Sequence, residues 1–153
     1  MVHVIFVCTG NICRSPMAEA VFQTLVSEAG LNDQITVDSA GTGGWHVGEK
    51  AHSGTLNILR QKGITYQGTA RQVSQSDLTE ADYLIAMDES HLTFIQRMGT
   101  PKAIIALMMD YAPEMGEREV PDPYYDGRFE RVYELVRASS EGLLQAIRSK
   151  HSL

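Results

Sequence analysis

Cysteine is scarce in this sequence: Cys8 and Cys13 are the only two among 153 residues. So few cysteines exclude a scaffold held by disulfides and a zinc site with four cysteine ligands. The sequence also lacks internal repeats, low-complexity segments and any apolar run long enough to cross a membrane. Its short N-terminal apolar run has no basic flank, which disfavours a signal peptide. We therefore expect a cytoplasmic protein whose thiols stay reduced.

Positive charge is also in short supply. Thirteen Lys and Arg residues stand against nineteen Asp and Glu residues, and the formal net charge is −6 at pH 7. This balance argues against a nucleic acid or an anionic membrane as a partner. Any bound anion must therefore be held by a local group of donors. The length and the 43% hydrophobic content suit one globular domain, which we place at residues 1–153.

Apolar runs that fit strands alternate along the chain with patterns that fit helices. The expected strands are Val2–Val7, Ile35–Ser39, Tyr83–Met87 and Ala103–Leu107. The expected helices are approximately Pro16–Ala29, closed by Gly30, then Ser53–Lys62, a helix capped by Asp88 that carries Leu92, Ile95 and Met98, and Gly127–Lys150. This order predicts a three-layer α/β fold, with a parallel sheet and helices on both faces. Ligands in such folds bind beyond the carboxyl ends of the strands, where Cys8 and Asp88 would lie.

The segment Cys8–Ser15, with the sequence CTGNICRS, joins the first strand to the first helix. The backbone amides of such a loop and of a helix N-terminus converge on one anion. Cys8 adds a nucleophile that should ionise readily beside these donors, and Arg14 adds a planar fork that matches phosphate. A Cys-x5-Arg spacing is weak evidence by itself, but between a strand and a helix start it predicts phosphoryl transfer through a phosphocysteine.

Two side chains of this loop have more than one interpretation. Ser15 is either the N-cap of the helix, with Pro16 as its first residue, or a hydrogen-bond donor to the Cys8 thiolate, and the two roles are compatible. Cys13 is either a packing thiol or a partner that traps oxidised Cys8 in a disulfide. A metal site formed by His3, Cys8 and Cys13 is disfavoured, because a strand and a tight loop direct these groups apart.

A second cluster, Val120–Gly127, has the sequence VPDPYYDG and precedes the last helix. Its composition alone indicates a loop. Cleavage of an aryl phosphate also needs a proton donor for the leaving oxygen, and Asp122 between two prolines lies on a stiff turn that suits this task. Tyr124 and Tyr125 would form apolar walls for an aromatic ring. Trp45, the only tryptophan, lies in a Gly-rich loop after a strand and is expected to form a further wall.

The segment Cys8–Pro16 together with Asp122–Tyr125 resembles the low-molecular-weight protein tyrosine phosphatase family. The resemblance extends along the chain through Asp38–Thr42, Gly44–Gly48, Ala70–Gln72 and Ala86–Ser90. It implies a four-stranded parallel sheet in the order 2-1-3-4, hydrolysis of phosphotyrosine in a protein or peptide, and no metal or cofactor. It also implies that Cys8 is the nucleophile, Arg14 the phosphate clamp and Asp122 the general acid and then base.

The same resemblance assigns supporting roles to further residues. Phosphate binding and support of the loop are implied for Thr9, Gly10, Asn11, Ile12, Cys13, Ser15 and Ser39. Walls of the substrate pocket are implied for Ile12, Trp45, Tyr124 and Tyr125.

Two departures from the family concern the outer support of the loop. Many relatives carry a histidine where this chain has Gly68, and often an asparagine where it has His91. One interpretation is that His91, on the helix that begins after Asp88, replaces the lost hydrogen bond by holding Asn11 or a neighbouring backbone group. The alternative is a solvated His91 in the first turn of its helix.

Three other activities fit the sequence less well. Arsenate reductases of this fold relay a disulfide through cysteines outside the loop, and this chain has none there. Phosphocysteine carriers need neither Arg14 nor Asp122. Phosphoarginine hydrolases within the family tend to have a threonine at the position of Ile12 and to lack the pair of tyrosines. Ile12 with Tyr124 and Tyr125 therefore favours an aryl phosphate.

Overall fold

The computed structural model describes residues 1–153 and contains one parallel sheet of four strands in the order β2-β1-β3-β4. The strands are β1 (Val2–Cys8), β2 (Ile35–Gly41), β3 (Tyr83–Ala86) and β4 (Ile104–Leu107). β1 pairs with β2 as far as Cys8 opposite Gly41, and with β3 as far as Val7 opposite Ala86. The predicted fold class and strand order are confirmed. The carboxyl ends of three strands therefore meet at Cys8.

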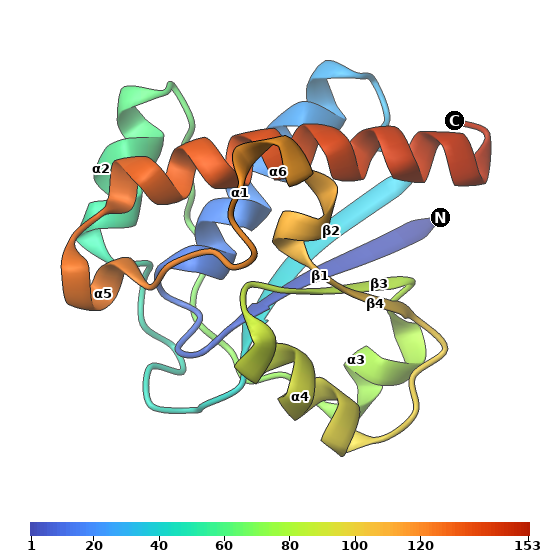
Figure 1. Ribbon diagram of the computed structural model, residues 1–153, viewed down its shortest axis with the longest axis horizontal. Coiled ribbons are helices and arrows are strands. Elements are labelled where there is room, and N and C mark those ends of the chain that lie inside the picture. The colour runs from blue at the N-terminus through green and yellow to red at the C-terminus, as the bar shows by residue number, and fades with distance from the viewer.

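Helices cover both faces of the sheet, as Figure 1 shows. One face carries α1 (Arg14–Glu28), α2 (Ser53–Gln61) and α6 (Phe129–His151), and the other carries α3 (Gln75–Glu80) and α4 (Glu89–Met98). The side chains of β1 alternate between two cores. Val4 and Phe6 pack into the core with α1 and α6, whereas Ile5 and Val7 pack into the core with α3 and α4. Burial on both faces explains why Val4–Val7 is a continuous apolar run.

The first helix begins earlier than the sequence predicts. α1 starts at Arg14, two residues before Pro16, and Cys13 precedes it without any capping by a side chain. The prediction that Ser15 is the N-cap is therefore wrong. Pro16 is tolerated at the third helical position because the N–H groups of a first turn have no partner within the helix. At the other end, Gly30 has a φ of 70° directly after the C-cap Ala29, as predicted.

Several short elements have no counterpart in the predicted set. α3 has only six residues, and its sequence signal is the capping box formed by Ser74 and Asp77. A one-turn helix, α5 (Pro123–Asp126), begins after Asp122 within the predicted loop. Two 3-10 helices, Met108–Tyr111 and Pro113–Met115, follow β4. None of the helices combines the length and the apolar character that a membrane crossing requires.

Candidate active site

A cavity of about 260 Å³ opens where β1 ends. Cys8 and Arg14 are 2% and 3% exposed, and they line it together with other residues of the Cys8–Ser15 loop. Trp45, Tyr124 and Tyr125 line it too, but these aromatic side chains are 73%, 53% and 85% exposed. The arrangement is a narrow polar base with an aromatic mouth. The lining set is Cys8, Thr9, Gly10, Ile12, Cys13, Arg14, Trp45, His46, Asp122, Tyr124 and Tyr125.

Asn11 and Ser15 connect the Cys8 thiol to the rest of the fold. Ser15 Oγ lies 2.9 Å from Cys8 Sγ, and the Asn11 amide donates to Ser15 Oγ over 2.8 Å and to Ser39 Oγ over 3.0 Å. Asn11 has a φ of 57°, in the left-handed region that few residues other than glycine adopt. Its Oδ1 accepts the backbone N–H of Arg71 over 2.9 Å. The loop conformation is therefore held by side-chain hydrogen bonds from two directions.

The Arg14 guanidinium is fixed by three separate segments of the chain. Nη1 donates to Asp88 Oδ2 over 2.8 Å and to the Val120 carbonyl over 3.1 Å. Nη2 lies 3.4 Å from Thr9 Oγ1 and 3.5 Å from Asp122 Oδ2. Burial acts to raise the pKa of Asp88, but hydrogen bonds from Ser90 and Arg14 and nearby positive charge outweigh it, so the pKa is lowered. Asp88 therefore stays ionised and orients the guanidinium.

Asp122 lies across the cavity from the loop, directly before α5. Its Oδ1 accepts the backbone N–H of Tyr124 over 3.1 Å, which makes Asp122 the N-cap of that helix. Its Oδ2 faces Arg14 Nη2, and the side chain is 31% exposed. One carboxylate oxygen is thus held by the turn, while the other faces the base of the cavity.

His91 is 1% exposed, so the alternative of a solvated residue is wrong. Its Nε2 lies 2.8 Å from Thr9 Oγ1, and its Nδ1 lies 3.2 Å from the backbone nitrogen of Asp88. The imidazole does reach the loop, but it holds the Thr9 side chain and not Asn11. Burial lowers the pKa of His91 to about 4, which keeps the ring neutral at physiological pH.

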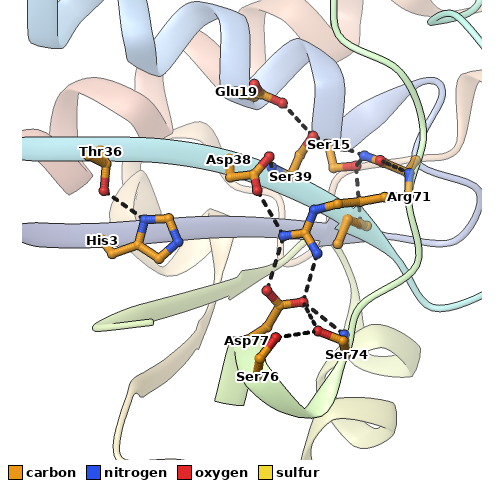
Figure 2. A network of polar contacts seen from close by, with 12 residues as sticks. His3, Ser15, Glu19, Thr36, Asp38, Ser39, Arg71, Ser74, Ser76 and Asp77 are labelled. Carbon is orange, nitrogen blue, oxygen red and sulfur yellow. Dashed lines mark hydrogen bonds and ion pairs between the residues drawn. The ribbon is translucent and has the colours of Figure 1, made fainter. Parts of the chain in front are cut away.

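Cys13 is buried beside Ile12 and Ala70, at the start of α1. Burial, followed by the charges of Cys8 and Asp122, raises the pKa of Cys13 to about 12. Cys13 is therefore a protonated thiol at neutral pH. No group of three or more His, Cys, Asp or Glu side chains is arranged to hold a metal ion. The His3 imidazole bonds Thr36 Oγ1 over 2.7 Å, on the neighbouring strand β2 (Figure 2).

Sequence reasoning missed several residues around the site. Arg71 bridges two elements, with Nη2 2.9 Å from Asp38 Oδ2 on β2 and Nη1 2.9 Å from Asp77 Oδ2 on α3 (Figure 2). The Ala70–Gln72 motif marked this segment, but its role follows only from the fold. His46 lines the cavity beside Trp45, and an added Cβ at Gly10 would lie 2.8 Å from its ring. A side chain at position 10 would therefore displace the His46 ring from the cavity wall.

A parallel sheet whose central strand ends in a Cys-x5-Arg loop, with an aspartate facing the arginine, defines a cysteine-dependent phosphatase. The chain matches the model of the family described as low molecular weight phosphotyrosine protein phosphatase over residues 3–153, and it belongs to that family.

Individual relatives agree with this placement. The low molecular weight protein-tyrosine-phosphatase YfkJ of Bacillus subtilis is 47% identical over 156 residues, covering 100% of both chains. Its crystal structure superimposes with a TM-score of 0.95 at 46% identity and covers 98% of this chain and 96% of its own. A low molecular weight protein-tyrosine-phosphatase of Streptomyces coelicolor is 47% identical over 97% of this chain and 94% of its own length. A Drosophila arginine phosphatase structure has a TM-score of 0.90 at 33% identity, covering 97% and 98%.

Proposed function

We propose that this protein is a tyrosine phosphatase that hydrolyses phosphotyrosine in proteins or peptides, and other aryl phosphates, through a phosphocysteine at Cys8. The observation that carries this proposal is the shape of the cavity: Cys8 and Arg14 are buried at its base, and three aromatic side chains form its exposed mouth. A phosphoryl group fits the donor-rich base, and the aryl ring of the substrate lies between Tyr124, Tyr125 and Trp45, with Ile12 as an apolar wall.

In the first step, the Cys8 thiolate attacks phosphorus opposite the phenolic oxygen. The S–P bond forms as the P–O bond breaks, and Asp122 transfers its proton to the departing oxygen. Negative charge on the three equatorial oxygens is stabilised by Arg14 and by the amides of the loop Thr9–Cys13. Asp88 and the Val120 carbonyl hold the guanidinium in one plane, so no reorganisation is needed during the reaction.

In the second step, water hydrolyses the phosphocysteine. The Asp122 carboxylate now removes a proton from the water molecule, the new P–O bond forms and the P–S bond breaks. Cys8 leaves as a thiolate, which the Ser15 hydroxyl stabilises from 2.9 Å away. Asp122 ends protonated and ready for the next substrate, and inorganic phosphate is released.

The test is turnover of matched peptides carrying phosphotyrosine, phosphoserine or phosphoarginine, measured in the presence of a chelator. We expect rapid hydrolysis of the phosphotyrosine peptide, and none in Cys8→Ser. Faster hydrolysis of the phosphoarginine peptide would reject the aryl specificity but keep the cysteine mechanism. Turnover retained by Cys8→Ser would reject the mechanism itself.

We also propose that residues 1–153 form one catalytic domain that acts in the cytoplasm on phosphorylated proteins. A reducing compartment keeps Cys8 available as a thiolate, which the mechanism requires. The net charge of −6 disfavours binding to nucleic acid or to an anionic membrane. Localising the tagged protein in cells of its source tests the compartment.

A further inference from the structure

Behind the Cys8 loop, a set of hydrogen bonds extends from Ser39 to Glu19 and then to Tyr66. The Ser39 hydroxyl lies 2.5 Å from Glu19 Oε1, and the Tyr66 hydroxyl lies 2.9 Å from the same oxygen. Glu19 belongs to α1, and Tyr66 lies in the segment between α2 and α3. Figure 2 shows Glu19 directed at Ser39, with Ser15 close by. The proposed mechanism assigns no role to Glu19 or Tyr66.

The direction of each hydrogen bond in this set is determined by its neighbours. Asn11 Oδ1 accepts the Arg71 N–H, so the NH₂ group of Asn11 must face Ser15 and Ser39 and donate to both. Ser39 Oγ accepts a hydrogen bond from one of these N–H groups, so its own O–H must donate to another acceptor. That acceptor is Glu19 Oε1, because a carboxylate oxygen accepts.

The same reasoning determines the acceptor to which the Ser15 hydroxyl donates. Ser15 Oγ accepts the other Asn11 proton over 2.8 Å, so its own proton is available for Cys8 Sγ at 2.9 Å. The alternative acceptor, the Ala40 carbonyl, is farther away at 3.5 Å. An uninterrupted series of donors and acceptors therefore connects Glu19, on α1, to the nucleophile.

We propose that Glu19 and Tyr66 are positioning residues for phosphoryl transfer: they hold Ser39 as the acceptor for Asn11 and thereby keep Ser15 donating to Cys8. This inference rests on the proposed function. Tyr66 supplies the second proton to Glu19 Oε1, which compensates a half-buried carboxylate. Burial acts to raise the pKa of Glu19, and the hydrogen bonds from Ser39 and Tyr66 oppose that effect. Without Glu19, the Ser39 hydroxyl is free to rotate and Asn11 loses one of the contacts that hold its left-handed conformation.

Gly68 is explained by the same arrangement. A Cβ at position 68 would lie 2.3 Å from the Tyr66 hydroxyl and 2.6 Å from its Cζ. A histidine, which relatives often carry there, is thus incompatible with Tyr66 in its present place. Gly68 therefore leaves the space that Tyr66 occupies. Tyr66 in turn supports the Cys8 loop through Glu19 and Ser39, which Gly68 cannot do because it has no side chain.

The experiment measures Cys8 directly. The rate of iodoacetamide alkylation is followed against pH, and the modified residue is assigned to Cys8 by fragment-ion mass spectrometry. We expect the midpoint pH to rise by about half a unit in Tyr66→Phe and by about one unit in Glu19→Leu. In the same variants, kcat for a phosphotyrosine peptide should fall roughly three- to tenfold, with KM within about twofold of the wild type. Glu19→Gln keeps an acceptor oxygen and should retain most of the wild-type behaviour.

Tyr83→Phe is the matched control, since it also removes a tyrosine hydroxyl, one that bonds His151 over 3.1 Å outside this set. It should leave the alkylation midpoint and kcat unchanged. Gly68→Ala should displace Tyr66 and reproduce Tyr66→Phe, and the double variant should be no worse than either single one.

An unchanged midpoint and kcat in a folded Tyr66→Phe enzyme would overturn the inference, even if its Tm fell. Alkylation needs no phosphate ester, so it stays informative if the wild type does not hydrolyse phosphotyrosine. A wild type that does not hydrolyse phosphotyrosine would reject the proposed function, while the alkylation midpoints would still test the role of Glu19 and Tyr66.

Discussion

The His91 imidazole and the Thr9 hydroxyl form a partly buried hydrogen bond of 2.8 Å that joins α4 to the phosphate loop. The other ring nitrogen accepts the Asp88 N–H, so the proton of the neutral ring lies on Nε2 and is donated to Thr9. Arg14 Nη2 approaches the same hydroxyl at 3.4 Å. α4 and its N-cap therefore contact the loop twice, through Asp88 to Arg14 and through His91 to Thr9.

We expect His91→Ala to lower turnover of a phosphotyrosine peptide several-fold while leaving the fold intact. One lost hydrogen bond corresponds to about 1 kcal/mol, and more if a buried group is left unpaired. Thr9→Val should have a similar effect. Because the two side chains share one bond, the double variant should be no more impaired than His91→Ala, which also loses the bond from the Asp88 N–H. Losses that simply multiply would show that the two residues act separately.

His91 should also make the stability depend on pH. Its pKa is about 4 in the folded protein against 6.5 for an unperturbed histidine, so between these values the unfolded chain binds more protons. The free energy of unfolding contributed by His91 therefore falls as pH falls from 6.5 towards 4, by at most on the order of 3 kcal/mol. Urea titrations of the wild type and His91→Asn at several pH values measure the difference. The pKa of Glu19 is raised, so its contribution to the free energy of unfolding grows as pH falls. Both proteins contain Glu19, so the difference between their free energies of unfolding isolates the contribution of His91. Parallel pH profiles for the two proteins would contradict the prediction.

Arg14→Lys should be almost as damaging as Arg14→Ala. A lysine supplies a point charge, whereas the guanidinium donates to Asp88 and Val120 and presents a second edge to the phosphoryl group. Steady-state kinetics on a phosphotyrosine peptide test this expectation. Cys8→Ser serves as the reference, since it should lose turnover yet still bind vanadate through the intact loop. A lysine variant within a few-fold of the wild type would argue against the clamp.

Asp122→Asn should slow hydrolysis of phosphates of poorly leaving phenols by on the order of 10²-fold. The defect should shrink for activated phenols, which leave without a proton. A series of aryl phosphates with graded leaving groups measures the dependence. The same loss across the whole series, with an unchanged basic limb in the pH–rate profile, would remove Asp122 from the role of acid.

Hydrogen peroxide should inactivate the enzyme, and added thiol should restore it. Oxidation gives a sulfenic acid on Cys8, and the Cys13 thiol can displace water from it to form a disulfide that thiols reduce. In Cys13→Ser the same dose should leave more irreversible loss. The raised pKa of Cys13 makes it a slow partner, so the comparison is made over several incubation times. Equal recovery in both proteins would assign Cys13 to packing alone.

The sequence predicts the fold well because its strands and long helices are local patterns. Val4–Val7 is apolar throughout because both faces of the strand are buried, and α6 repeats apolar residues at helical spacing. The Cys8 loop can also be predicted from the sequence, because the strand, the loop and the helix follow one another along the chain. α3 escaped prediction because its six residues include only one apolar side chain, Leu78, which gives no periodicity, and its capping box lies in an otherwise irregular segment.

Contacts between distant segments could not be predicted in the same way. His91 lies four positions before Ile95 and shares the buried face of α4 with it, but this spacing does not show that the imidazole bonds Thr9 of the loop. Tyr66 is one of six tyrosines, and nothing local distinguishes it from the others. Its link to Glu19 spans 47 positions and depends on the relative placement of α1 and the segment after α2.

The Val120 carbonyl and Asp88 hold Arg14 from 106 and 74 positions farther along the chain. During synthesis, the loop with its cysteine leaves the ribosome first, whereas the groups that orient the arginine leave much later. A nascent chain that stops before residue 120 thus has its nucleophile but no fixed phosphate clamp. Catalytic competence is then acquired only near the end of translation, which makes phosphatase activity a reporter of the completed fold.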